Sequence, residues 1–426
     1  MPRIVFIVPS FPRLSETFIV NKFVGLRRQG WDVFVICSES SAEEMKSFEQ
    51  LLNDYDLRRR IKIIWPHQSV PLTALLAPFS FVRCLLLNPR GTITYVVRGW
   101  ERYGFDLLRR FYLDAELISL KPDLIHFEFG TLAVARTYLK AMLGCKLVVS
   151  FRGYDLNYMG LDSPDYYKTI WKQADAVHLL GQDLWNRAQR RGCQPDKQRF
   201  LIPPAIDADF FNPNGRAHTE TVGDRGRPLR ILSVGRLDWR KGYDYALQAV
   251  RLLIEQGIAC EYRIVGEGEY LEAVAFARHQ LGLEHSVELL EAQSPPEVKK
   301  QMLWADILLH ASVSEGFCNA VLESQSMELP VVCTDAGGLP ENVSDNETGF
   351  VVPRRDPAQL ADRMLLLARD PELRARLGNA GRRRVLARFA LETQIAEFGA
   401  LYNQVLQADR IKDDVPTLLS TKSLEY

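Results

Sequence analysis

Residues 229–244, LRILSVGRLDWRKGYD, carry the pattern that decides the fold. An apolar β-branched run, Leu229–Val234, is followed by a glycine-bounded loop and then by a helical pattern that begins near Asp244. A strand, a loop and a helix in this order form the unit from which parallel α/β sheets are built. The second half repeats the unit, with further strands predicted at Glu261–Val265, Val287–Leu290, Asp306–His310 and Val331–Thr334. We therefore expect a doubly wound α/β domain here.

The first half shows the same alternation of short apolar runs and longer amphipathic ones. A helix is predicted over Thr17–Arg28, ended by Gly30. The predicted strands are Arg3–Val8, Trp31–Cys37, Leu124–Phe127, Lys146–Phe151 and Ala176–Leu180. The fold class is therefore α/β, with two doubly wound, Rossmann-like domains.

Prolines interrupt this rhythm from about Gln194 to Pro228, where a linker is expected. The predicted division is an N-terminal domain at 1–205, a linker at 206–228, a C-terminal domain at 229–390, a C-terminal helix at 391–408 that packs back towards the N-terminal domain, and a loose tail at 409–426.

Composition excludes several classes of protein. The 426 residues carry 53 lysines and arginines against 53 aspartates and glutamates, so no nucleic-acid partner is expected. The seven scattered cysteines contain no Cys-x-x-Cys pair, which favours a reduced cytoplasmic compartment over a disulfide framework or a zinc site. We read no export signal and no apolar segment long enough to cross a bilayer.

Two cations lie on the loop that follows Leu229–Val234. Arg236 and Lys241, between Gly235 and Gly242, can hold a diphosphate together with the N-terminus of the next helix. The alternative is a solvated basic turn.

Two glutamates flank the start of the helix expected after Asp306–His310. Glu315 is predicted in the loop and Glu323 about two turns into the helix, so they span roughly 12 Å of helix axis. Such a pair can reach two sets of hydroxyls on one extended ligand, but it is too far apart to act as an acid and a nucleophile on one bond. Alternatively, Glu315 stabilises the helix N-terminus and Glu323 lies on a solvated face.

Glycines supply weaker signals. Gly337-Gly338, past the end of another strand, lets backbone amides approach an anionic group, although such pairs are often ordinary turns. Gly266 and Gly268 suggest a dinucleotide fingerprint, but Leu271 stands where its third glycine belongs. A redox enzyme is therefore not expected.

Taken together, these segments resemble the retaining glycosyltransferases of family four. The Glu-x7-Glu motif is Glu315 to Glu323, and the basic pair is Arg236 and Lys241. They are accompanied, in the family's order, by Pro330-Val331-Val332, Gly337-Gly338-Leu339-Pro340-Glu341 and Thr348-Gly349-Phe350. The match covers nearly all of Leu229 to Pro353, and it implies the GT-B architecture, in which two Rossmann-like domains face a central cleft.

The resemblance implies a nucleotide-sugar donor site in the second domain. Arg236 and Lys241 neutralise the leaving diphosphate, Glu315 binds hydroxyls of the donor sugar and Glu323 binds the ribose; Arg236, Lys241 and Glu315 are expected to be catalytic. The other residues expected at the donor are Gly266, Gly316, Phe317 and Asn319. No metal and no other cofactor is expected, because fixed cations can stabilise the leaving group and no Asp-x-Asp or metal-ligand cluster appears at a suitable strand end.

In the first domain, the segment 9–18, PSFPRLSETF, is similar to a Ser-Glu-Thr-Phe loop of exopolysaccharide transferases. Ser15, Glu16 and Thr17 are therefore expected to face the cleft on the acceptor side.

Two further segments of the first domain are similar to family segments. His126, in Pro-Asp-Leu-Ile-His, stands where the family carries an active-site histidine, although an ordinary packed histidine is the alternative. Arg152, in Ser-Phe-Arg-Gly-Tyr-Asp, stands where many members have histidine, and with Asp155 it is expected to contact the acceptor, where it can hold a phosphate or carboxylate.

Residues 70–120 combine apolar runs, interleaved aromatics and six arginines. This composition suits the inner face of an anionic cytoplasmic membrane, where the region presents a lipid-linked acceptor. A pair of core-packing helices with solvated arginines is the alternative.

The expected activity is retaining transfer of a hexose-type sugar from a nucleotide-sugar to a hydroxyl of a glycan or lipid-linked glycan in bacterial surface polysaccharide biosynthesis. UDP is the expected nucleotide, because it is common among the relatives. The alternatives are a sugar-nucleotide epimerase of the same architecture, which needs no acceptor, and a catalytically inactive partner subunit.

Overall fold

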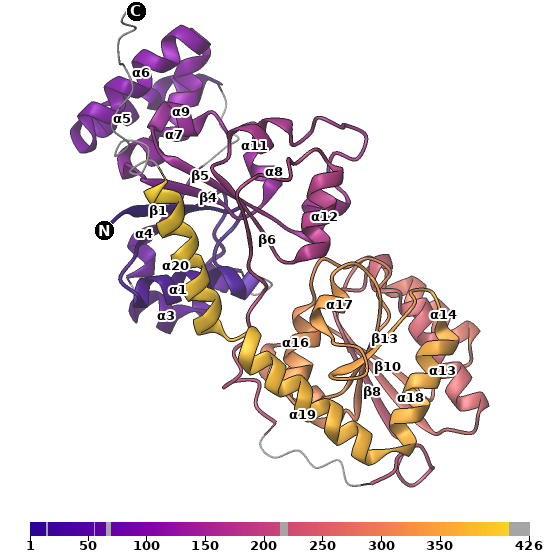
Figure 1. The fold of residues 1–426 in the computed structure, drawn as a ribbon. Coiled ribbons are helices and arrows are strands. Elements are labelled where there is room, and N and C mark those ends of the chain that lie inside the picture. The colour runs from indigo at the N-terminus through magenta and orange to yellow at the C-terminus, as the bar shows by residue number, and fades with distance from the viewer. Residues whose placement is uncertain (14–15, 55, 65–69, 214–219, 409–426) are drawn as a thin grey trace, which may run out of the picture.

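The computed structural model describes residues 1–13, 16–54, 56–64, 70–213 and 220–408. It shows two α/β lobes, each built on its own parallel sheet (Figure 1). The first sheet has the order β3-β2-β1-β4-β5-β6-β7 and the second β10-β9-β8-β11-β12-β13. In both sheets the strand order reverses once, between β1 and β4 and between β8 and β11, so the predicted doubly wound α/β fold is confirmed.

The ten predicted strands are all present, with ends that agree within one residue. In the first lobe they are β1 Arg3–Ile7, β2 Asp32–Cys37, β4 Leu124–Phe127, β5 Lys146–Phe151 and β6 Ala176–Leu179. In the second they are β8 Leu229–Val234, β9 Cys260–Val265, β10 Val287–Leu290, β11 Ile307–His310 and β12 Val331–Thr334. The sequence prediction missed β3 Ile61–Ile63, β7 Arg199–Leu201 and β13 Gly349–Val352. Each is a strand of three or four residues at a sheet edge, which is too short to give a periodic signal.

Helices cover both faces of the first sheet. One face packs against α1 Thr17–Arg28, the helix predicted from the sequence, and α20 Leu391–Gln407. The other face packs against α7 Asp106–Leu120, α8 Gly130–Ala133, α9 Leu139–Leu143, α11 Lys168–Gln173 and α12 Gln182–Arg190. Although α20 is the last described helix of the chain, it lies on the first lobe (Figure 1). It approaches α1 so closely that a Cβ on Gly25 would lie 1.9 Å from the Cδ1 of Ile395.

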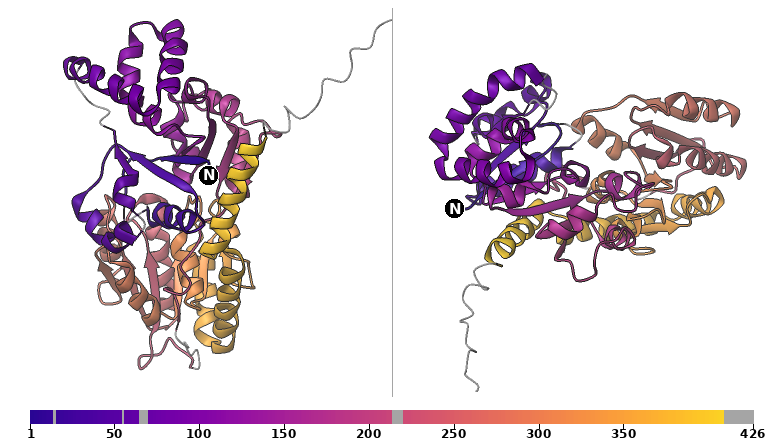
Figure 2. Two further views of the ribbon diagram at one scale, coloured as in Figure 1. Left: turned by 90° about the vertical axis from the view of Figure 1, so that its left-hand side faces the viewer. Right: turned by 90° about the horizontal axis from the view of Figure 1, so that it is seen from above.

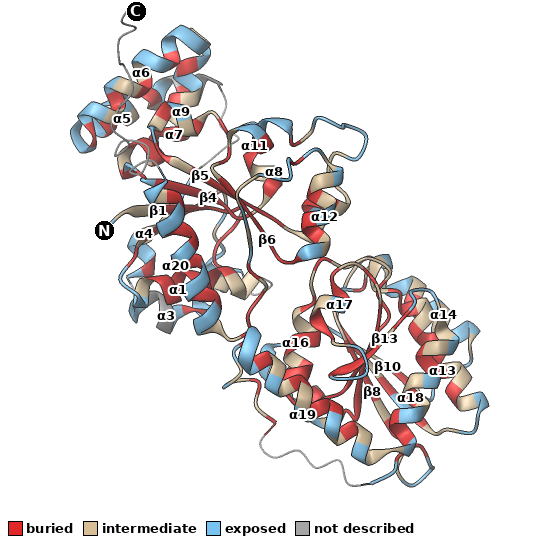
Figure 3. Ribbon diagram, viewed as in Figure 1, coloured by how far each residue is buried: buried red, intermediate tan, exposed pale blue. Residues whose placement is uncertain are grey.

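The second sheet is covered in the same way, and its strands are buried on both faces (Figure 3). One face carries α13 Tyr243–Glu255, α14 Leu271–Gln280 and α18 Pro357–Arg369. The other carries α15 Pro295–Trp304, α16 Asn319–Ser326, α17 Leu339–Asn342 and α19 Pro371–Arg388. Strands buried on two faces explain why they read as continuous apolar runs.

A small helical layer packs on the side of the first lobe that is far from the second lobe (Figures 1 and 2). It consists of α5 Val70–Leu87, α6 Pro89–Tyr103 and the first half of α7, around a small core with Tyr95 and Phe111 at its centre. Much of α5 and α6 is exposed (Figure 3). No helix in the part of the chain that the structure describes is both long and apolar enough to span a bilayer.

Four short helices of the first lobe remain to be given. They are α2 Ala42–Ser47, α3 Glu49–Asp54, α4 Leu57–Arg60 and α10 Gly153–Asn157.

The two lobes touch through loops at the carboxyl ends of their strands. Tyr158 Oη lies 2.6 Å from Ser314 Oγ, and a Cβ on Gly316 would lie 2.8 Å from the Cα of Gly153. Phe317 packs against the cores of both lobes. Loops of the two lobes therefore meet between the sheets.

Glu341 makes a second contact between the lobes. Its carboxylate accepts hydrogen bonds from the backbone N–H groups of Gln182 and Asp183 at 2.7 and 2.9 Å. A side chain of the second lobe thus caps α12 of the first lobe, an interaction of about 1 kcal/mol.

The linker predicted at 206–228 is described only in part, and residues 214–219 lie outside the described chain. The tail predicted at 409–426 also lies outside it, so the prediction of a loose tail stays untested.

Candidate active site

The main site lies at the switch point of the second sheet, where the strand order reverses between β8 and β11. Ligands of open α/β sheets bind at such points, because loops and helix N-termini leave a crevice there. A cavity of about 270 Å³ opens at this position between the two lobes. Its lining includes Arg236, Arg240, Lys241, Glu315 and Gly316 of the second lobe and Gly153, Tyr154, Asn157 and Tyr158 of the first.

A lysine and a glutamate form the centre of this site. Lys241 ends a 3₁₀ turn, Trp239–Lys241, and its Nζ donates a hydrogen bond of 2.6 Å to Oε2 of Glu315. Gly242 brings the two loops together: its φ is +63°, and a Cβ there would lie 2.2 Å from the carbonyl oxygen of Ala311. The sequence-predicted residues of the two loops are therefore in direct contact.

The electrostatic environment favours the ionised forms of both Lys241 and Glu315. Burial opposes ionisation of both groups, but the carboxylate raises the pKa of Lys241, and the ammonium helps to lower the pKa of Glu315 to about 2. The pair is ionised at neutral pH.

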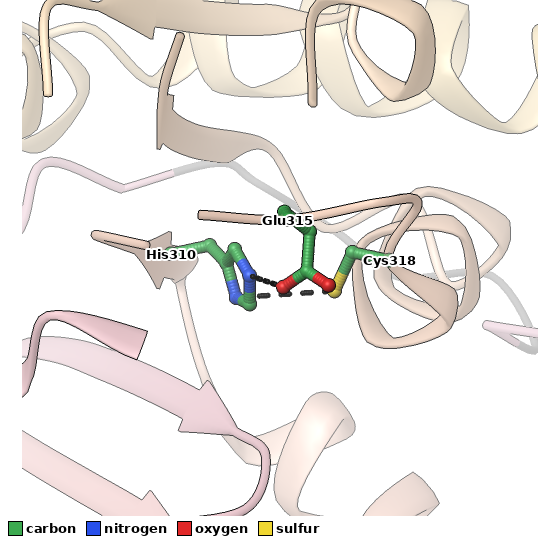
Figure 4. A group of neighbouring side chains, drawn as sticks. All are labelled: His310, Glu315 and Cys318. Carbon is green, nitrogen blue, oxygen red and sulfur yellow. Dashed lines mark hydrogen bonds and ion pairs between the residues drawn. The ribbon is translucent and has the colours of Figure 1, made fainter. Parts of the chain in front are cut away.

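Three further side chains surround the carboxylate of Glu315, and Figure 4 shows two of them, His310 and Cys318. His310 Nε2 lies 3.3 Å from Glu315 Oε2 and 3.0 Å from Ser312 Oγ, and Cys318 Sγ lies 4.0 Å from His310 Nδ1. Burial lowers the pKa of His310, but the neighbouring Cys318 and Glu315 raise it to about 9. Glu315 is thus held between two cations, Lys241 and His310.

The same residues correct one expectation from the sequence. His310, Glu315 and Cys318 bring potential metal ligands within 4.8 Å of one another, although no such cluster was expected at a strand end. The set fits a cation poorly, because Lys241 already pairs with the Glu315 oxygen that a metal ion would bind. The expectation that the protein uses no metal stays a prediction.

The cations of the 235–242 loop differ in how they are paired. Arg240 donates from Nε to Asp238 Oδ1 at 2.7 Å and lies over the ring of Tyr158. Among the described residues, no carboxylate lies within ion-pair distance of Arg236. Arg236 therefore faces the cavity with its charge available to an anion.

Glu323 occupies a separate position in the second turn of α16. Burial raises its pKa to about 7. No hydrogen bond or ion pair joins it to Glu315 in the described structure, and its role at the donor stays a prediction.

The other residues expected at the donor occupy different positions. Gly316 lines the cavity, Asn319 is the first residue of α16, and Phe317 packs between the lobes. Gly266 has a φ of +153°, and a Cβ there would lie 2.0 Å from the carbonyl oxygen of Gly235. Close packing of two loops thus requires this glycine whether or not it contacts a ligand.

His126, expected at the family's active-site histidine position, does not line the cavity. Its side chain is 0% exposed, because β4 is buried on both faces of the sheet. Nδ1 lies 2.7 Å from Tyr402 Oη of α20 and 3.2 Å from Lys22 Nζ, and Nε2 lies 2.7 Å from Ser150 Oγ. Burial and the nearby Lys22 lower the pKa of His126. A packed, neutral histidine fits this position, and catalysis by direct contact with a substrate does not.

The expected acceptor-side residues lie at the carboxyl edge of the first sheet. Arg152 Nη2 pairs with Glu128 Oε2 at 3.2 Å, and its guanidinium lies over Phe18. Asp155 is buried, with its carboxylate accepting the backbone N–H groups of Arg152 at 2.8 Å and Thr131 at 3.0 Å. Asp155 therefore fixes the backbone rather than facing an acceptor.

The loop expected to face the cleft is described only in part. Thr17 begins α1, and Glu16 before it is half-buried, which raises the pKa of its carboxyl group. Ser15 lies outside the described residues.

Sequence reasoning missed the buried charges under Arg152. Lys22 of α1 donates to Glu128 Oε1 at 2.5 Å, and both side chains are almost fully buried. The available signal was a lysine within the apolar stripe of α1 and a glutamate directly after an apolar strand. Removing one partner of such a pair costs about 3–5 kcal/mol.

Comparison with known families decides the class of protein. The model of the family "Glycosyl transferase 4-like domain" matches residues 15–204, and that of "Glycosyl transferases group 1" matches residues 217–384. The chain belongs to the family 4-like glycosyltransferases. The two matches cover both lobes of the glycosyltransferase in turn.

The enzyme is similar along most of its length to two curated glycosyltransferases. It is 27% identical to the putative colanic acid biosynthesis glycosyltransferase WcaL of Escherichia coli, over 85% of this chain and 89% of that one. It is 28% identical to the amylovoran biosynthesis glycosyltransferase AmsK of Erwinia amylovora, over 86% and 90%.

Solved structures confirm the GT-B architecture. The Anabaena protein Alr3699/HepE, crystallised with UDP, superimposes with a TM-score of 0.69 at 15% identity, over 95% of this chain and 100% of that one. A sucrose-phosphate synthase from Thermosynechococcus elongatus superimposes with a TM-score of 0.67 at 18% identity, over 96% and 100%.

The pKa of Glu323 leads to a testable dependence of stability on pH. Because the folded protein holds this proton up to about pH 7, against an ordinary pKa of 4.5, stability is lost as the pH rises between these values. We expect Glu323→Gln to raise the free energy of unfolding at pH 8 by up to about 3 kcal/mol, from 1.36 kcal/mol per pKa unit, and to change it little at pH 5. Urea unfolding at both pH values measures this. An equal change at both would show that folding does not desolvate the Glu323 carboxyl group.

Proposed function

We propose that this glycosyltransferase moves a hexose-type sugar from a UDP-sugar, with retention of configuration and without a metal, to a hydroxyl of a glycan or lipid-linked glycan. The observation that carries the proposal is the ionised Lys241–Glu315 pair in the interlobe cavity, with Arg236 beside it. The arrangement offers cations for a diphosphate and a carboxylate for sugar hydroxyls within one small space.

The Lys241–Glu315 contact suggests how the donor binds. Lys241 is neutralised by Glu315 before a ligand enters. A diphosphate competes for the same ammonium, and Arg236 adds a second cation. When Lys241 turns to the phosphates, the Glu315 carboxylate becomes available to hydroxyls of the donor sugar, while His310 keeps it oriented.

The same contacts support retention without a covalent intermediate. Glu315 is held by Lys241 and His310, and Cys318 is buried, so neither is placed as a free nucleophile. In the proposed step the acceptor hydroxyl attacks on the face that the diphosphate leaves. Its proton passes to a phosphate oxygen of the leaving group, and Arg236 and Lys241 stabilise the charge that develops there.

The relatives support a role in bacterial surface polysaccharide biosynthesis. WcaL and AmsK are named for the biosynthesis of colanic acid and of amylovoran. We place the acceptor in the N-terminal domain, residues 1–205, because the donor groups belong to the second lobe. Exopolysaccharide or lipopolysaccharide precursors are the proposed acceptors.

The helical layer of the first lobe supports a place at the inner face of the cytoplasmic membrane. Its exposed apolar residues include Phe79, Leu86, Leu87, Val97, Trp100, Phe105 and Leu108. Arg90 and Arg109 are exposed among them. Apolar side chains beside arginines suit an anionic bilayer surface.

A binding and turnover experiment tests the donor assignment. Purified protein is melted with UDP, ADP, GDP or CDP, and each UDP-sugar that stabilises it is incubated with and without a lipid-linked glycan. Of the four nucleotides, we expect only UDP to stabilise the fold, by about 2.7 kcal/mol at a concentration of 100 Kd. UDP should be released only when the acceptor is present, and the glycosylated product should be α-linked. Conversion of the sugar without acceptor would support an epimerase, and binding without turnover an inactive partner; either would overturn the proposal.

A further inference from the structure

A second cavity lies in the first lobe, outside the site described above. It has a volume of about 300 Å³ and a floor made by the carboxyl ends of β1 and β2, at Ile7, Val8 and Ile36. One wall is the first half of α7, and the other is the connection that follows β4, including Arg136. The strand order of the first sheet reverses between β1 and β4, so this cavity occupies the switch point of its sheet, as the first cavity does in the other sheet.

Three arginines line this second cavity: Arg109, Arg110 and Arg136. Arg110 Nε donates to Asp106 Oδ2 at 2.7 Å, and Arg136 Nη2 lies 3.5 Å from Asp114 Oδ1. For Arg109, no carboxylate of the described residues lies within ion-pair distance. The lining therefore carries more cations than carboxylates.

Asp114 is held in place by hydrogen bonds from two tyrosines. It is buried, and its Oδ2 accepts hydrogen bonds of 2.7 Å from both Tyr95 and Tyr138. Burial raises the pKa of its carboxyl group. Its position fixes Arg136 at the cavity wall and leaves that guanidinium partly exposed to a ligand.

We infer that the second cavity binds a phosphate or diphosphate ester carried by the acceptor. The inference rests on the proposed function, since it assigns to the first lobe the charged part of the molecule that receives the sugar. Guanidinium groups suit this task, because they present paired N–H donors to phosphate oxygens. Apolar side chains of the lining, among them Ile36 and Leu132, lower the local dielectric constant and strengthen these bonds.

Both cavities lie at the carboxyl edge of the first sheet, two strands apart. The floor of the second cavity is at β1, and Gly153, which lines the first cavity, follows β5. Only β4 lies between β1 and β5, so the two strands are roughly 10 Å apart, or two strand spacings. A short oligosaccharide anchored by its phosphate can place a hydroxyl in the first cavity.

The mouth of the second cavity also suits a lipid. Phe105, one turn before Arg109, and Leu108, the residue directly before Arg109, are 83% and 62% exposed. A polyprenyl chain attached to a bound diphosphate can pass over these side chains towards α5 and α6.

Calorimetry with inorganic pyrophosphate tests the inference. Titrations are made with and without saturating UDP, so that the donor site is blocked in one of them. We expect binding to persist with UDP present, and Arg109→Ala and Arg136→Lys each to weaken it at least tenfold. Arg90→Ala, at an exposed arginine of α6 outside the cavity, is the matched control and should leave it unchanged. A titration with farnesyl diphosphate in place of pyrophosphate distinguishes a lipid-linked acceptor from a soluble one. Tenfold tighter binding than that of pyrophosphate indicates a lipid diphosphate, and equal binding indicates a soluble phosphate ester.

Two results would overturn the inference. Pyrophosphate that binds only when UDP is absent would show that it occupies the donor site alone. Binding that Arg90→Ala weakens as much as Arg109→Ala would show a general surface attraction. Failure of the proposed function is recognised separately, because UDP itself would then not bind.

Discussion

Replacing Glu315 by glutamine is expected to slow sugar transfer by about three orders of magnitude while UDP binds as tightly as before, or more tightly. The carboxylate is proposed to hold hydroxyls of the donor sugar, and loss of one preorganised contact of this kind costs about 3–4 kcal/mol in the transition state. The same carboxylate competes with the diphosphate for Lys241, at 2.6 Å in the unliganded protein. Removing it leaves the ammonium free for UDP.

Single-turnover rates with the UDP-sugar and calorimetry with UDP measure the two effects separately. A melting curve serves as the control for folding, because the variant leaves Lys241 and His310 as neighbouring cations and should lower the melting temperature. Parallel losses of UDP affinity and rate would contradict this account, since they would assign Glu315 to the nucleotide rather than to the sugar.

Replacing Lys241 by alanine is expected to weaken UDP binding about a hundredfold and to slow transfer further. A charge-assisted hydrogen bond contributes about 1.5–3 kcal/mol, and here the lost cation also stabilises the leaving group. Arg240→Ala is the matched control, because Arg240 lies on the same turn and lines the same cavity, but its guanidinium is already paired with Asp238.

Calorimetry with UDP and steady-state rates for both variants provide the comparison. We expect the Arg240 variant to lose less than about fivefold in affinity, as for a cation whose charge is already compensated. If Arg240→Ala lost as much affinity for UDP as Lys241→Ala, the total charge of the loop rather than the position of Lys241 would determine donor binding.

The parts of the fold that could be predicted from the sequence are those whose signal is local. The central strands, such as Leu229–Val234, are buried on both faces and read as apolar runs. The loops after them could be located for the same reason, and with them Arg236, Lys241 and Glu315. Edge strands such as β3 Ile61–Ile63 lack this signal, because three residues show no period.

The contacts that decide how the site works arise from tertiary structure. His310 reads as the end of an apolar strand, and only the return of the chain at Glu315 and Cys318 makes it a cation beside a carboxylate. The burial of His126 could not be predicted for a similar reason, since Tyr402 of α20, which covers it, comes from the other end of the chain. Neither contact is encoded in a local spacing.

The second cavity was also missed, because its arginines are far apart in the sequence. Arg109 and Arg110 belong to a segment whose composition suggested a membrane surface, and Arg136 follows a different strand. The crossing of α7 over the switch point brings them together. Strand order, which a single sequence does not reveal, was the missing information.

A crystal structure of the protein with UDP tests the central claim most directly. We expect the diphosphate at the switch point of the second sheet, within hydrogen-bonding distance of Lys241 and Arg236, the ribose at Glu323, and Glu315 released from Lys241. UDP bound elsewhere, or bound with the Lys241–Glu315 pair intact and the phosphates away from both cations, would contradict it.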